Sequence, residues 1–181
     1  MTDYPWYDLI DNSSEITQGD ILFQCPVAKL AENNDYKAGN EFNAEAEIDI
    51  IDGIILTQAC DIENSKVNNI ILCAITSKVD FESQLSDSGK SRKDIQKDLE
   101  GIVKWQQNAL HIINCYESEK FKQDFYIVNF KDVFSIPLIL AQKIAKDNGK
   151  RLRLLPPYRE HLSQAFARFF MRVGLPVNIK L

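Results

Sequence analysis

The sequence of 181 residues lacks any run of about 18 apolar residues, which is the length that a membrane-spanning helix requires. Its first residues, M-T-D-Y-P-W-Y-D, lack the basic start and the apolar centre of a secretory signal peptide. Internal repeats and low-complexity segments are missing too. We therefore expect a protein of the cytoplasm that does not enter a membrane, with 45% hydrophobic residues forming a sizeable core.

Cysteines are few, and no two of them form a C-x-x-C pair, which disfavours a zinc ribbon. In a reducing cytosol disulfides are not expected, so Cys25, Cys73 and Cys115 are interpreted as small buried apolar side chains. Cys60 differs because Asp61 follows it and turn residues surround the pair. We expect no bound metal or cofactor; a mixed site of Cys60, Asp61 and a histidine is the alternative.

The net charge of −5 is unevenly distributed along the chain. Residues 1–118 carry 9 Lys or Arg against 21 Asp or Glu, a net −12, and residues 119–181 carry 12 against 5, a net +7. The acidic majority argues against a general nucleic-acid coat, whereas the basic C-terminal third leaves room for a local phosphate-binding patch. Attraction between the two regions within the fold is the alternative explanation.

The order of patterns predicts a single α+β domain over residues 1–181. Strands are expected at 21–25, 48–58 and 70–76, and again at 125–130, 133–138 and 150–155. Apolar residues at three- and four-residue steps predict helix over 91–117, after a polar loop at 83–90, and Gly53 predicts a bulge or bend. The expected parts are an N-terminal arm (1–15), strands (16–82 and 121–156), a helical insertion (83–120) and a C-terminal helix (157–175).

Several short phrases occur in an order that resembles the PemK/MazF-type toxins. They are I-T-Q-G-D-I-L, then I-I-L-T-Q, then A-I-T-S at 74–77, and finally R-L-R-L-L before a C-terminal helix. The resemblance covers residues 16–77 and 150–175. It implies a small, strongly curved SH3-like β-barrel, to which residues 83–120 would add the helical insertion.

The functional part of this resemblance is incomplete. In that family an Arg-Pro pair before the second strand and a Ser or Thr at the end of that strand act on RNA, and Thr57 matches the Ser/Thr position. The Arg-Pro pair is missing, since the corresponding stretch reads E-I-D-I-I-D-G. Carboxylates at this place would repel a phosphate backbone, which argues against the usual cleavage chemistry there.

Four residues are candidates for catalysis: Thr57, Cys60, Asp61 and His161. A Cys60 thiolate would need a base, and the only histidines are His111, set among apolar neighbours, and His161, in the basic C-terminal helix. Candidates for nucleic-acid contact are Arg151, Arg153, Arg159, Arg168 and Arg172, because arginine suits bidentate phosphate recognition. Aromatic residues of the N-terminal arm (Tyr4, Trp6 and Tyr7) and of the C-terminal helix could dock a protein.

The sequence favours a binding or accessory module, without strong catalysis, that contacts a protein partner, and RNA is a further candidate ligand. The resemblance implies a toxin–antitoxin or defence-like bacterial setting. One alternative is a divergent metal-independent endoribonuclease of PemK/MazF type using Thr57. The second alternative is a thiol-dependent enzyme centred on Cys60.

Overall fold

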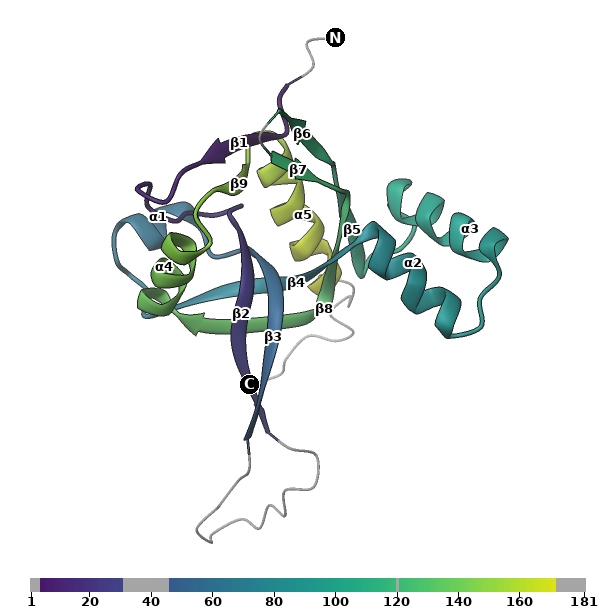
Figure 1. Ribbon diagram of the computed structural model, residues 1–181, viewed down its shortest axis with the longest axis horizontal. Coiled ribbons are helices and arrows are strands. Elements are labelled where there is room, and N and C mark those ends of the chain that lie inside the picture. The colour runs from purple at the N-terminus through teal and green to yellow at the C-terminus, as the bar shows by residue number, and fades with distance from the viewer. Residues whose placement is uncertain (1–3, 31–45, 120, 172–181) are drawn as a thin grey trace, which may run out of the picture.

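The computed structural model describes residues 4–30, 46–119 and 121–171, which form a mixed α+β fold (Figure 1). The strands in these ranges are β1 (Tyr7–Ile10), β2 (Ile21–Leu30), β3 (Ala46–Ile55), β4 (Asn69–Ser77), β5 (Leu110–Ile113), β6 (Tyr116–Ser118), β7 (Phe121–Gln123), β8 (Tyr126–Pro137) and β9 (Arg151–Leu154). The helices are α1 (Ala59–Glu63), α2 (Lys78–Asp87), α3 (Arg92–Val103), α4 (Leu138–Asp147) and α5 (Tyr158–Phe170). No helix in this part of the chain is long and apolar enough to cross a membrane.

The main sheet has the strand order β2-β3-β4-β8-β5, and every neighbouring pair is antiparallel. Two smaller sheets, β1-β9 and β6-β7, are antiparallel as well. In the described ranges no ladder joins the edge strands β2 and β5, so the main sheet is open there rather than closed into a barrel. A single bridge between Asp20 and Arg153 links β9 to the chain just before β2.

Strand β4 explains why the sheet has apolar residues on both faces. Ile70 and Leu72 pack into one buried cluster, while Cys73 and Ile75 pack into another, as alternation along a strand requires. Helix α4 contributes to the first cluster and α5 to the second. The strand predicted at 70–76 is confirmed, and it lies in the interior of the main sheet, between β3 and β8.

Gly53 is required by close packing rather than by an unusual backbone. A Cβ atom at this position would lie 2.8 Å from Cζ of Phe134 and 3.2 Å from Cβ of Leu72. The irregularity predicted near Gly53 lies on the partner strand, between Leu22 and Cys25, where Gln24 has a φ of +58°. There the backbone N–H of Gln24 donates to the Asp52 carboxylate at 2.8 Å.

The predicted boundaries of the helical insertion need correction. Residues 83–87 of the predicted polar loop belong to α2, which Ser77 caps by accepting from the Asp80 N–H. The helix predicted over 91–117 is α3 and ends at Val103, and residues 110–113 return as the edge strand β5. The sequence L-H-I-I is compatible with the periodicity of a helix and with that of a strand. Its hydrogen bonding to β8 makes it a strand.

Three smaller differences concern other segments. The strands expected at 125–130 and 133–138 are one long strand, β8, and part of the N-terminal arm is the strand β1. The expected turn after Thr57 includes the short helix α1. Between β8 and β9 the chain forms the helix α4.

Candidate functional site

Thr57 lies directly after β3, where the resemblance places a catalytic hydroxyl. Its Oγ1 accepts a hydrogen bond of 2.7 Å from the backbone N–H of Ile71. Among the hydrogen bonds and ion pairs of the described chain, none joins Thr57 to an arginine. The side chain therefore serves to fasten the end of β3 to β4, and the hydroxyl and guanidinium that the toxin family combines are not brought together here.

Cys60 and Asp61 belong to the short helix α1. The exposed Cys60 Sγ lies 3.8 Å from Oε1 of Gln58 and 3.7 Å from Oδ1 of Asp61. Local hydrogen bonds account for the turn, including one of 2.6 Å from the Asn64 side chain to the Cys60 carbonyl. Over the described residues no group of three or more Cys, His, Asp and Glu is placed to hold a metal ion.

His161 lies on α5, apart from α1 in Figure 1. Its nearest ring neighbours are Trp105 and Tyr158, each at a centroid distance of 6.3 Å. The contacts of Cys60 are with residues of its own turn. The structure therefore does not bring His161 to Cys60 as a base.

Arg151 and Arg153 form a buried ion-pair cluster with Asp20. The fully buried Arg151 donates from Nε to Oδ2 of Asp20 at 2.8 Å, and its remaining nitrogens donate to the carbonyls of Asp11, Ser14 and Glu15. With no exposed surface, Arg151 is not available to a phosphate in this structure. Arg153 binds the same carboxylate but keeps 21% of its side chain exposed, so its role stays a prediction.

The other predicted arginines differ in their surroundings. Arg159 donates from Nη2 to Oε1 of Glu160 at 2.7 Å, so its charge is partly neutralised. Arg172 lies outside the described residues. Arg168 is exposed on α5, and its Cζ lies 5.9 Å from the ring centroid of Trp105, within the range of a cation–π contact.

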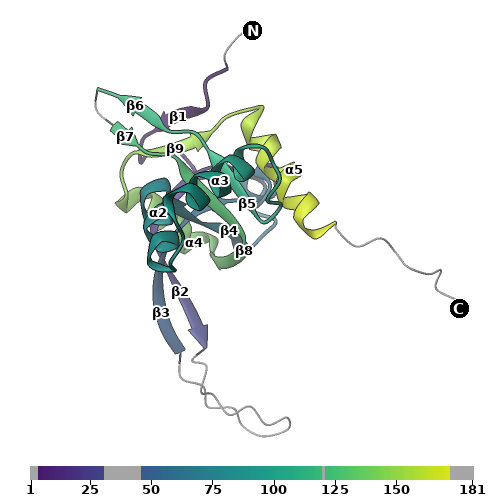
Figure 2. The same ribbon diagram turned by 90° about the vertical axis from the view of Figure 1, so that its right-hand side faces the viewer.

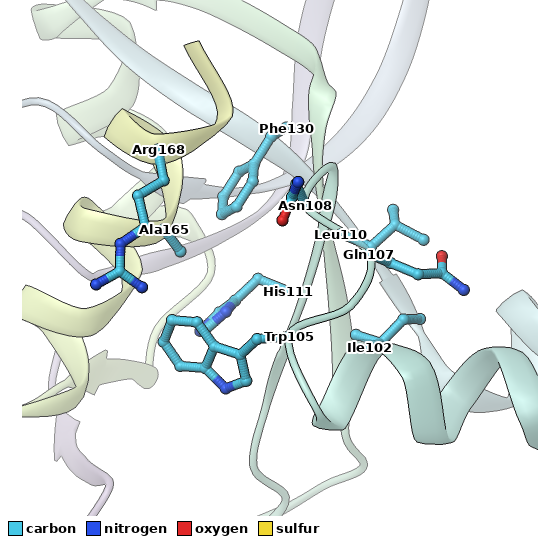
Figure 3. Close-up of a pocket in the computed structure, with 9 residues that line it drawn as sticks. All are labelled: Ile102, Trp105, Gln107, Asn108, Leu110, His111, Phe130, Ala165 and Arg168. Carbon is cyan, nitrogen blue, oxygen red and sulfur yellow. The ribbon is translucent and has the colours of Figure 1, made fainter. Parts of the chain in front are cut away.

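Arg168 thus leads to a pocket between α5 and the segment that follows α3 (Figure 3). The cavity has a volume of about 70 Å³. It is lined by Ile102, Trp105, Gln107, Asn108, Leu110, His111, Phe130, Ala165 and Arg168. We call this feature the Trp105 pocket.

The backbone reversal at the end of α3 places Trp105. Lys104 ends the helix, and Trp105 follows with a φ of +60°, the left-handed conformation that often closes a helix. Its N–H donates to the Ile102 carbonyl at 3.0 Å. The reversal turns the indole back toward β5, and 46% of Trp105 remains exposed to solvent.

His111 forms the inner wall of the pocket. Only 8% of this residue is exposed, and its ring lies 5.2 Å from Trp105, edge to face, and 6.1 Å from Phe130, nearly parallel. Burial, with a smaller contribution from the charge of His161, lowers the pKa of His111 to about 4. The imidazole is therefore neutral near pH 7, when it has one N–H donor and one acceptor nitrogen.

The outer wall comes from α5. His161 and Arg168 are seven residues apart, which puts them on the same face of the helix two turns from each other. The small Ala165 between them leaves room over the cavity. Both histidines of the chain thus flank one indole, and an exposed guanidinium lies over that indole.

The chemistry of the Trp105 pocket is that of binding a flat, polar, anionic ligand. An exposed indole can stack on a heterocycle, and Arg168 can pair with a phosphate. The cavity is too small to enclose a base, so a ligand would lie across the exposed indole. Sequence reasoning missed Trp105, because its role depends on the chain reversal and not on any local motif.

Comparison with models of known protein families and with curated proteins gives no match. The fold and the site therefore describe this protein as a mixed α+β protein with an antiparallel main sheet. It has an aromatic, cationic surface pocket beside the helix α5.

Proposed function

We propose that this protein is a binding module that holds single-stranded RNA at the Trp105 pocket. The observation that carries the proposal is that His111, His161 and Arg168 all lie close to the exposed ring of Trp105. Stacking of a base on an aromatic ring combined with a nearby cation for phosphate is the common way to bind single strands. The exposed guanidinium of Arg168 supplies the cation.

The proposal places the protein in the cytoplasm, in a toxin–antitoxin or defence-like setting, where it works beside a protein partner. The likeness to PemK/MazF-type sequences motivates this part. In this view, the open sheet with β9 attached through Asp20 and Arg153 is a divergent form of the curved barrel of that family. Strong catalysis is not part of the proposal, since no described arginine is hydrogen-bonded to Thr57 and Arg151 is paired with Asp20.

Fluorescence polarisation with a labelled oligouridine RNA tests the proposal on the full chain. Trp105→Ala should weaken binding by about tenfold, because stacking of one base contributes about 1–3 kcal/mol. The matched control is Phe170→Ala, which removes another exposed aromatic side chain, on the same helix as Arg168 but outside the pocket lining. The absence of RNA binding by the wild-type protein, or equal weakening in both variants, would refute the proposal.

A second candidate function, metal-independent RNA cleavage, is favoured by the two imidazoles close to Trp105, at ring-centroid distances of 5.2 Å for His111 and 6.3 Å for His161. One imidazole could accept the 2′-hydroxyl proton while the other donates a proton to the departing 5′-oxygen, leaving a cyclic phosphate. Incubating RNA with the protein in EDTA tests this idea. Cleavage that is abolished in His161→Gln but kept in Thr57→Ala supports the imidazole pair, whereas abolition in Thr57→Ala instead supports chemistry of the PemK/MazF kind.

A further inference from the structure

A second concave surface lies at the end of the molecule where β1 and β6 lie close together in both Figure 1 and Figure 2. Its volume is about 500 Å³, which is much larger than that of the Trp105 pocket. Five aromatic residues line it: Tyr4, Trp6, Tyr7, Tyr116 and Tyr158. We call it the tyrosine groove.

The walls of this groove are fastened to one another. The indole of Trp6 stacks on Tyr158 with ring centroids 3.7 Å apart and planes inclined by 11°. The Tyr158 hydroxyl donates to the Tyr4 carbonyl at 3.3 Å, and the Leu155 N–H donates to the Trp6 carbonyl at 2.9 Å. The N-terminal segment is thus held against the start of α5.

The floor of the groove joins this wall to the opposite one. The buried hydroxyl of Tyr7 donates to the carbonyl of Asn114 at 2.6 Å, and the Tyr7 ring meets Tyr116 edge to face at 6.2 Å. Two segments more than 100 residues apart therefore form one surface. Such a groove is prepared before any ligand arrives, which reduces the entropy cost of binding.

Three hydrogen-bond donors around the groove are available. No hydrogen bond within the described chain uses the indole N–H of Trp6 or the hydroxyls of Tyr4 and Tyr116. The one charged lining residue, Glu117, pairs with Lys122 at 3.0 Å. The groove therefore offers aromatic faces and donors with little net charge.

We propose that the tyrosine groove binds a proline-rich segment of a partner protein in the polyproline II conformation. In that conformation the backbone carbonyls have no internal partners and point outward, where tyrosine hydroxyls and an indole N–H can donate to them. Proline rings lie well on aromatic faces, and aromatic-lined grooves are a recurrent way to recognise such segments.

The same features disfavour two other ligand classes. A quaternary ammonium ion cannot accept a hydrogen bond, so it would leave all three donors without a partner. A phosphate would face Glu117 without an unpaired cation in the lining of the groove. An extended segment with carbonyls and flat rings satisfies both the donors and the aromatic surface.

Fluorescence polarisation on the full chain tests this proposal with two labelled twelve-residue peptides. One repeats Leu-Pro-Pro, and the other has alanine at each proline. The variants are Tyr116→Phe, which removes one donor hydroxyl but keeps the ring, and Trp6→Phe. The matched control is Tyr126→Phe, the same change at a residue outside the groove. Circular dichroism verifies that every variant is folded.

The proline peptide should bind at least tenfold more tightly than the alanine peptide. Tyr116→Phe should weaken binding of the proline peptide by about fivefold, as expected when one hydrogen bond is removed. The affinity of Tyr126→Phe for the same peptide should stay within about twofold of wild type. Equal affinity for both peptides, or no binding of the proline peptide, would overturn the proposal. So would displacement of the peptide by tetramethylammonium, which would identify a cation site. Loss of RNA binding in Trp105→Ala alone leaves this result unaffected, so the two proposals are tested separately.

Discussion

The carboxylate of Asp20 and the guanidinium of Arg151 form an ion pair of 2.8 Å in which neither side chain is exposed. Gly19, with a φ of +86°, turns the chain so that Asp20 enters the interior, and Arg151 reaches it from β9. The pair links the two sequence phrases G-D-I and R-L-R, 131 residues apart. These phrases are therefore explained by the architecture of the fold.

Asp20→Asn should lower the free energy of unfolding by about 3–5 kcal/mol, because Arg151 would remain buried without a counter-ion. Urea denaturation measures the decrease. Asp49→Asn is the matched control, since its pair with Lys29 is about half exposed and should contribute less than about 1 kcal/mol. Similar decreases in the unfolding free energy of the two variants would contradict the prediction that leaving Arg151 buried without a counter-ion is strongly destabilising.

His111 should make the stability depend on pH between its unfolded and folded pKa values. The ordinary histidine pKa of 6.5 falls to about 4 in the folded state, so only the unfolded chain takes up this proton between those values. Stability is then fully present above pH 6.5 and is lost as the pH falls toward 4.

Protonation of His111 should lower the free energy of unfolding by about 2–3 kcal/mol between pH 7 and pH 4.5. Other groups titrate in this range as well, so the informative quantity is the difference in unfolding free energy between wild type and His111→Gln across the range. Wild type should lose stability relative to the variant as the pH falls. A difference that does not change with pH would contradict a buried, neutral His111.

Thiol reactivity should divide the four cysteines into two pairs. Cys25 and Cys73 are buried as predicted, and burial raises the pKa of each thiol to about 12. Cys60 and Cys115 are exposed, so the interpretation of Cys115 as a buried side chain is wrong. An aromatic disulfide reagent should therefore label two thiols of the folded protein and four in urea. Replacing Cys60 and Cys115 by serine should remove all labelling of the folded state, and persistent labelling would show that a thiol assigned to the interior is accessible.

Two glycine substitutions should change stability in opposite directions. Gly53→Ala forces a Cβ to 2.8 Å from the Phe134 ring, and overpacking of this kind costs about 1–3 kcal/mol. Gly101→Ala, in the interior of α3, meets its nearest atom at 3.5 Å and should stabilise by up to about 1 kcal/mol through helix propensity. Thermal unfolding measures both, and a neutral Gly53→Ala would contradict the packing around β3.

Much of the sheet could be predicted because its strands follow local patterns. The doubly apolar run of β4 predicts a central strand, and the alternation at Arg151 to Leu154 correctly separates arginines from leucines. The role of those arginines was not predictable locally. Their shared partner, Asp20, is more than 130 residues away, and alternation alone does not tell an exposed face from a buried ionic one.

The candidate site was harder to predict for a related reason. His161 and Arg168 stand out because the C-terminal helix is basic, but Trp105 lies in a segment whose pattern predicts continued helix. The left-handed turn at Trp105 reverses the chain and brings the indole to His111. The spacing of apolar residues does not predict such a reversal. The Cys60 motif stands out in the sequence, yet its contacts are confined to its own turn.

The salt dependence of RNA binding tests the central claim most directly, because it counts the phosphates that the protein neutralises. For a single strand, the slope of log affinity against log salt changes by about 0.7 for each phosphate that is neutralised. Arg168→Gln is compared with Lys143→Gln, which removes one exposed positive charge on α4, outside the pocket lining. We expect Arg168→Gln to reduce the slope by about 0.7 and Lys143→Gln to leave it unchanged. Equal slopes for wild type and Arg168→Gln would contradict RNA binding at the Trp105 pocket.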